Sequence, residues 1–233
     1  MLQTATTFNL AASPFVPFAL GFFGLGVGYF VWGGQLLFGF PAATPNTDRS
    51  LGMWGIWMPG FMQFIAGITT LIGLTWFHVF AVGVATTPAY MAALAFTAYG
   101  VHWFVLGWRR YVQSDVMPDA WMAIPFFLIS VLGIIVFFDA KVNDKGVGIL
   151  FIFLALIYLS EALARFGLLP GGRPPMQSQD AVPERGLPTR IDTTNPLIGI
   201  RLVGLWQFLG GIWLMYLTYA LTLDLAIGAG WPV

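Results

Sequence analysis

Charged residues are so unevenly spaced that they divide the chain into long apolar stretches. No Asp, Glu, Lys or Arg precedes Asp48, and none occurs from Ser50 to Trp108. A helix needs about 20 apolar residues to cross a hydrocarbon core about 30 Å thick. The stretch 50–108 is therefore too long for one span and has to fold back once. Residues 85–88 are the expected turn, because the residue before Pro88 disfavours the helical conformation.

This pattern predicts an all-α integral membrane protein, a bundle of six transmembrane helices in one membrane domain that occupies residues 1–233. Transmembrane β-strands are about ten residues long and alternate polar with apolar residues, and no such alternation runs through this sequence. The expected spans are 14–38, 51–77, 88–108, 120–138, 146–164 and 197–223.

Three connections between these spans have distinct compositions. Residues 40–50 are rich in turn-forming residues and predict a loop, whereas 139–145 is short enough to predict a tight turn between antiparallel helices. Residues 167–196 are polar and rich in proline, and they predict an extramembrane surface segment that has no core of its own.

The composition supports a membrane protein and excludes several classes of function. Hydrophobic residues make up 58% of the chain and charged residues only 9%, against about 25% charged residues in soluble proteins. The net charge is zero, so nothing favours nucleic acid as a partner. The expected surroundings are a lipid bilayer, in the cytoplasmic (inner) membrane. The start lacks the basic region of a cleaved signal peptide, so the first span is expected to be retained.

Catalysis finds no support in the sequence. The chain has no cysteine and only two histidines, which excludes disulfides, thiolate metal sites and cysteine nucleophiles. We find no clustered metal ligands, no Ser–His–Asp set and no phosphate-binding glycine loop. We therefore expect neither an enzyme nor a bound cofactor or metal.

Ionisable residues inside the predicted spans are candidates for function, because a charge in hydrocarbon costs at least about 2.5–3.5 kcal/mol. His102 lies one turn from Tyr99, so it either faces the same lumen or bonds a neighbouring helix. Glu161 is either a proton site or the partner of Arg165 four residues later. Arg201 either draws anions or reaches the lipid headgroups.

Two segments carry a resemblance to a known family. Residues 60–67 read Gly-Phe-Met-Gln-Phe-Ile-Ala-Gly, and residues 96–103 read Phe-Thr-Ala-Tyr-Gly-Val-His-Trp. They resemble the Gly-x-x-Gln-x-x-Ala-Gly and Phe-Thr-x-Tyr-Gly-x-x-Trp blocks of the acetate/succinate permeases, the six-helix acetate uptake transporters. Gln63 is the glutamine of the first block, and we count it among the pore-lining or proton-linked candidates with His102, Glu161 and Arg201.

The resemblance implies a hexamer in which each protomer has its own pore. It also implies a pore constriction formed by Phe23, Tyr99 and Leu154. Ordinary core packing is the alternative for Phe23 and Leu154. The chain departs from the family where Thr69 and Thr70 follow the first block, since the family has an acidic residue there. The Asn-Pro at the family's first helix is also absent.

The expected function is a channel or transporter for a small monocarboxylate such as acetate, or a similarly small solute, in a passive or proton-linked process. One alternative is a urea or amide channel. Another is a non-transporting accessory subunit that contacts other membrane subunits through residues 167–196. Orientation is open: the arginines favour both termini outside by the positive-inside rule, whereas the resemblance implies both termini inside.

Overall fold

The computed structural model describes residues 15–80, 86–169 and 198–231. Throughout these residues the regular structure is helical, without a strand. The helices are α1 (Phe15–Phe38), α2 (Pro45–Gly55), η2 (Ile56–Phe61), α3 (Met62–Ile72), η3 (Gly73–Phe77), α4 (Thr86–Val112), α5 (Asp119–Phe138), α6 (Lys145–Arg165) and α7 (Ile198–Ile227). The segments from α2 to η3 form one continuous helix in which η2 and η3 are π-helical.

Six helices in the described part are long and apolar enough to cross a membrane. This confirms the predicted all-helical membrane fold. Most of segment 167–196, with the partner contact expected there, lies outside the described residues. Of the turn predicted at 85–88, residue 85 also lies outside them, whereas residues 86–88 already belong to α4. The third span therefore begins earlier than predicted, and the predicted position of the turn is wrong.

The second span begins earlier than predicted, so the expected loop at 40–50 is wrong in its second half. Helix α2 starts at Pro45, and the Thr44 hydroxyl caps it by accepting a hydrogen bond from the Thr47 amide at 3.1 Å. Pro45 at the first helical position also favours a helix start, because it has no amide proton to leave unpaired there. Asp48 in the first turn adds to this, because its carboxylate lies near the positive end of the helix.

The predicted tight turn at 139–145 is confirmed. Helix α5 ends at Phe138 and α6 begins at Lys145. The Asp139 carbonyl accepts hydrogen bonds from the amides of Val142 and Asn143 at 3.0 and 2.8 Å. Asp144 then caps α6 by accepting from the Val147 amide at 3.0 Å. These bonds reverse the chain, so α5 and α6 pack as an antiparallel pair.

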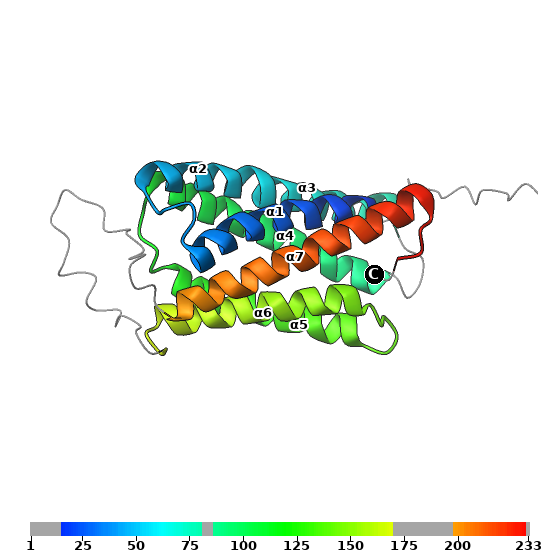
Figure 1. Cartoon of the computed structure of the whole chain (residues 1–233). Coiled ribbons are helices and arrows are strands. Elements are labelled where there is room, and N and C mark those ends of the chain that lie inside the picture. The colour runs from blue at the N-terminus through cyan, green and yellow to red at the C-terminus, as the bar shows by residue number, and fades with distance from the viewer. Residues whose placement is uncertain (1–14, 81–85, 170–197, 232–233) are drawn as a thin grey trace, which may run out of the picture.

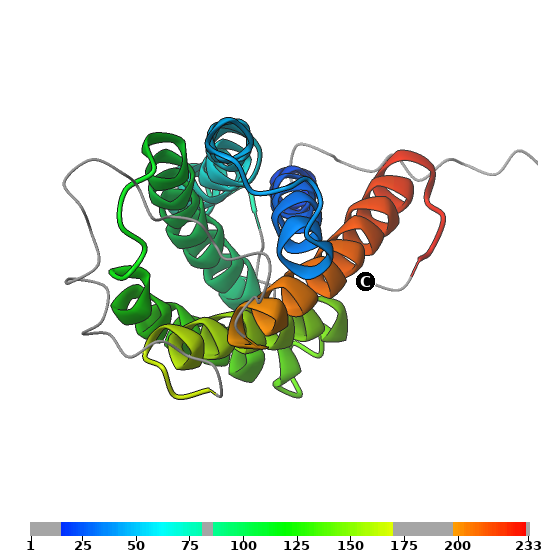
Figure 2. The ribbon, with the colours of Figure 1, turned by 60° about the vertical axis from the view of Figure 1, so that its left-hand side comes forward.

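The long helices run side by side along one direction (Figure 1). Helices α1, α4 and α6 finish at the end where α2, α5 and α7 begin, and we call it the arginine end because Arg49, Arg109, Arg110 and Arg165 lie there. The opposite end holds the 139–144 turn. Figure 2 shows α1 to α4 on one side of the bundle and α5 and α6 on the other, with α7 crossing obliquely past α1 and α6.

Exposed aromatic side chains mark both ends of the bundle. Trp108 and Trp121 lie exposed near the arginine end, and Trp76 and Tyr90 lie exposed near the opposite end. Tryptophan and tyrosine prefer the two interfaces between hydrocarbon and water. Their positions fit a bundle that spans the bilayer with its helices roughly along the membrane normal.

Glycines allow neighbouring helix backbones to approach closely. A side-chain carbon added at Gly24 of α1 would lie 2.5 Å from the Met58 carbonyl of η2, and one at Gly28 would lie 2.6 Å from Pro59. The pair at small-xxx-small spacing therefore packs within the protomer. Gly100 of α4 is equally tight and meets backbone atoms, because its added carbon would lie 2.5 Å from the Phe64 amide nitrogen and 2.9 Å from the Gly60 carbonyl oxygen.

We predict that Gly100→Ala destabilises the fold by roughly 1–3 kcal/mol, the usual cost of overpacking. The reason is that the new methyl group meets backbone atoms of α3 and η2, which cannot rotate away. Gly34→Ala is the matched control, since its added carbon meets nothing closer than 3.9 Å. Thermal unfolding in detergent, followed by tryptophan fluorescence, measures both variants. Equal melting temperatures for the two would contradict the close approach.

Candidate functional site

The inward faces of α1, α4 and α6 meet along a buried line that we call the central seam. Its residues recur every three or four positions on each helix, as one face of a helix requires. Rings from different helices touch along it: Phe22 with Phe96 at 5.2 Å, and Tyr29 with Trp103 at 5.8 Å, between ring centroids. The seam consists of Phe18, Phe22, Leu25, Tyr29, Phe96, Tyr99, Trp103, Leu150, Phe151, Leu154 and Tyr158, all of them buried.

A cavity of about 20 Å³ opens on the central seam. Tyr99 and Leu154 lie at one end of it, near the middle of α4 and α6. The residues that line it are Phe22, Leu25, Gln63, Ala92, Ala95, Phe96, Tyr99, Val147, Leu150, Phe151 and Leu154. Gln63 and Tyr99 are its polar lining residues, and the part toward the end opposite the arginines is apolar.

The structure therefore brings together two of the three predicted constriction residues, Tyr99 and Leu154, at the cavity. The third does not join them within the protomer. Phe23 points to the outer surface of α1 and is 40% exposed, whereas its neighbour Phe22 is 2% exposed and lines the cavity. Adjacent helical residues are about 100° apart, so the two rings cannot face the same side. The position of α1 at the cavity is Phe22, which corrects the prediction of Phe23.

Tyr99 has a defined hydrogen-bonding role. Its hydroxyl lies 2.7 Å from the Ser130 hydroxyl oxygen, and Ser130 donates its only proton to the Phe126 carbonyl at 2.6 Å. Because a hydroxyl has a single donor, Tyr99 is the donor to Ser130. The Tyr99 oxygen keeps its lone pairs as acceptors beside the cavity.

Aromatic rings fill the seam between Tyr99 and the arginine end. Tyr158 stacks on Tyr99 with ring centroids 5.8 Å apart and 9° between planes. His102 is buried and packs on Phe126 at 4.5 Å and on Tyr158 at 5.6 Å. His102 therefore lies on the same side of α4 as Tyr99 but outside the cavity lining. Its two sequence alternatives, a side chain that faces the lumen and one that bonds a neighbouring helix, stay predictions.

Gln63 is the most unusual polar residue of the site. Its side chain has no exposed surface, and both its amide nitrogen and its carbonyl oxygen lack a hydrogen-bond partner in the described part of the chain. A buried amide without a partner costs about 1–3 kcal/mol by mutational measurement. Gln63 is the second residue of α3, which follows the π-helical segment η2 directly. Such π-helical insertions often occur at functional sites.

Charged residues gather at the arginine end of the seam. Glu161 accepts from Arg165 at 3.0 Å, which confirms the predicted pair. Arg165 also lies 3.4 Å from Asp119, and Asp119 contacts Arg109. The sequence did not single out Asp119, because its partners lie on other helices. Arg201 is exposed on α7 and makes no described contact with the cavity lining.

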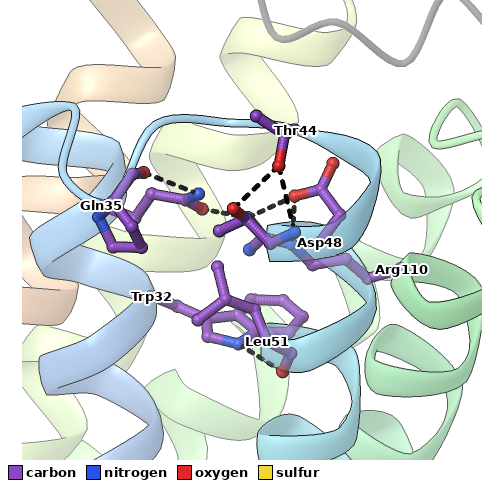
Figure 3. A network of polar contacts seen from close by, with 8 residues as sticks. Trp32, Gln35, Thr44, Asp48, Leu51 and Arg110 are labelled. Atoms are coloured by element: carbon purple, nitrogen blue, oxygen red, sulfur yellow. Dashed lines mark hydrogen bonds and ion pairs between the residues drawn. The ribbon is translucent and has the colours of Figure 1, made fainter.

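A second network at this end ties α1, α2 and α4 together (Figure 3). Arg110 donates to the Asp48 carboxylate from two nitrogens, at 3.0 and 2.8 Å, and also to the Gln35 carbonyl oxygen. Its guanidinium stacks 4.7 Å above the Trp32 ring. The Trp32 indole in turn donates to the Leu51 carbonyl at 3.0 Å. Asp48 thus lies in the first turn of α2 and anchors that helix to the last turns of α4.

No protein-family model, curated protein or solved structure matches this chain. The relation to the permease family therefore stays a prediction. Within the described residues, no group of three or more His, Cys, Asp or Glu side chains is placed to hold a metal ion.

We predict that Arg110→Met destabilises the protein by roughly 3–5 kcal/mol, because it leaves the Asp48 carboxylate without its partner. The double variant Asp48→Asn/Arg110→Met should recover part of this loss, since it removes both charges. Thermal unfolding in detergent measures the coupling. Arg49→Met is the control: Arg49 is exposed, and its change should stay within about 0.5 kcal/mol. Additive losses in the double variant would show that the pair is not coupled.

Proposed function

We propose that this protein is a membrane conduit for small uncharged solutes, with short carboxylic acids in their protonated form foremost. The observation that carries the proposal is the cavity on the central seam, which has Gln63 and Tyr99 among its lining residues near the middle of the helices. The resemblance of these two residues' segments to the acetate permeases supports the same class of solute. By that resemblance the conduit assembles as a hexamer, one seam per protomer, in the inner membrane.

The composition of the seam supports a neutral solute over an anion. Between Tyr99 and the end opposite the arginines, the cavity lining is entirely apolar. An ionised carboxylate without a paired cation costs several kcal/mol or more in such surroundings. A carboxylic acid therefore crosses this half with its proton bound, which makes net transport of the acid proton-linked without a dedicated proton carrier.

The aromatic residues supply a closed gate rather than an open pore. Tyr99, Phe126 and Tyr158 pack on one another at centroid distances of 5.3 to 5.8 Å. Apolar constrictions of this kind exclude water and ions until side chains move. The gate is also compatible with the accessory-subunit alternative, in which the packed rings stabilise the protomer and pass no solute.

The second candidate is a channel for urea or small amides. It is favoured by the unpartnered Gln63 carboxamide, since amide groups pair with one another through one donor and one acceptor each. Flux in proteoliposomes, compared for acetate, formate, urea and water, discriminates the candidates. An accessory subunit gives no flux above protein-free liposomes for any of them.

We predict that acetate flux falls roughly tenfold for each pH unit above the pKa of the acid, after subtraction of the flux in protein-free liposomes. The physical reason is that the neutral fraction of a carboxylic acid falls tenfold per unit there. Urea flux, measured in the same liposomes, is the control and should not change with pH. An acetate flux that follows the anion concentration would contradict passage of the neutral acid.

We also predict that Phe22→Ala and Leu154→Ala raise the flux of larger acids such as butyrate relative to acetate, because each widens the cavity. Phe23→Ala is the matched control, an identical substitution one residue away on the outer face, and should leave the ratio unchanged. Tyr99→Phe should lower flux, because it removes the hydroxyl oxygen that accepts a hydrogen bond from the solute, a bond worth roughly 0.5–1.5 kcal/mol. An effect of Phe23→Ala equal to that of Phe22→Ala would contradict the placement of Phe22, and not Phe23, at the cavity.

A further inference from the structure

We infer that the Gln63 carboxamide recognises the solute and selects compounds that carry a hydrogen-bond donor and acceptor side by side. Protonated carboxylic acids and primary amides are the compounds of this class. The inference deepens the proposed function and rests on it, because it names the group that recognises the solute and the class of solute that this group can bind.

The position of Gln63 supplies the first part of the argument. It lines the cavity, it is fully buried, and neither end of its carboxamide has a partner among the described residues. Tyr99, the other polar residue of the lining, pairs with Ser130. The Tyr29 hydroxyl and the Trp103 indole nitrogen also lack a partner among the described residues, but neither residue lines the cavity. In the wall of the cavity Gln63 thus has an unpaired donor and an unpaired acceptor, which a guest reaches once neighbouring side chains shift.

The backbone before Gln63 sets the direction in which its side chain leaves the helix. The preceding π-helical segment η2 contains the buried Pro59, which has no amide proton. An extra residue in a helical turn rotates everything after it by about 100° relative to a regular α-helix. The rest of α3 packs closely on α4, where Gly67 contacts the backbone of Thr97 and Ala93. Gln63 therefore lies in the wall of the cavity on a stretch of α3 that packs closely against α4.

The chemistry of a carboxamide sets the class of solute. It presents N–H donors and a carbonyl acceptor on one carbon. A protonated acid or a primary amide presents the reverse pair and forms two hydrogen bonds at once. A carboxylate has only acceptors, so one of its oxygens would face the Gln63 oxygen. A sulfoxide or ketone accepts one bond and leaves the Gln63 oxygen unpaired.

The cavity volume agrees with a small guest. About 20 Å³ exceeds the 10–15 Å³ that one water needs, so a single water is the rival occupant. A solute of four heavy atoms enters only when side chains around the cavity shift, and Phe22 and Leu154 are the apolar neighbours that border it. A water bound to Gln63 would stabilise the fold without discriminating between solutes, and this difference makes the two separable.

The test compares acetamide with dimethyl sulfoxide, which has the same number of heavy atoms but only an acceptor. Osmotic stopped-flow measures the entry of each into proteoliposomes, with protein-free liposomes subtracted. The variants are Gln63→Leu and Gln63→Met. Gln207→Leu is the matched control, because Gln207 of α7 is also a buried glutamine with an unpartnered oxygen but lies outside the cavity lining.

We expect both Gln63 variants to lower the ratio of acetamide to dimethyl sulfoxide flux roughly tenfold, the effect of about one or two lost neutral hydrogen bonds. Gln207→Leu should leave the ratio unchanged. Size-exclusion chromatography in detergent checks that each variant is folded, and the two Gln63 substitutions guard against misfolding of one.

The possible failures are distinct. No flux of either solute in the wild-type protein overturns the proposed function and this inference with it. Wild-type flux with a ratio that Gln63→Leu and Gln63→Met leave unchanged overturns the inference alone and assigns Gln63 to an ordered water. An equal fall of both fluxes, with the ratio kept, shows a structural role and also overturns it.

Discussion

The structure depends on one constraint, that hydrocarbon offers no hydrogen bonds to a polar group. Backbone amides satisfy it by forming helices throughout the described residues. The charged side chains satisfy it by gathering at the helix ends and pairing there, as Arg110 does with Asp48 and Arg165 with Glu161. The Arg110–Asp48 pair and the contact of Arg165 with Asp119 join different helices, so charged side chains also tie the helices together at this end.

The same constraint gives a meaning to the polar groups left in the middle of the bundle. Tyr99 meets it through Ser130. Gln63 does not meet it within the described protein. The cost of an unpaired buried amide is comparable to the whole benefit of a good core contact, and this is why we propose that Gln63 pairs with a solute. The proposed solute pathway follows from this imbalance.

Close packing decides how the remaining space is used. Without a hydrophobic driving force between helices in lipid, tight van der Waals contact holds them. Gly24, Gly28 and Gly100 let α1, η2, α3 and α4 approach closely. On the other side of α4, the rings of Tyr99 and His102 contact rings of α5 and α6. The bundle is therefore dense at the glycines and filled with rings along the central seam.

The sequence by itself determined the membrane class, the all-helical fold, the approximate spans and the 139–145 turn, because these follow from spacings along the chain that local chemistry obeys. It also singled out Tyr99, Gln63 and the Glu161–Arg165 pair. Only the tertiary structure decided that Phe22 and not Phe23 faces the cavity, that Asp119 joins the arginines, and that Gln63 has no partner. These depend on a helix's rotation about its own axis and on neighbours distant in sequence, and a rotation of 100° per residue is finer than apolar periodicity can define in a helix that is hydrophobic all round.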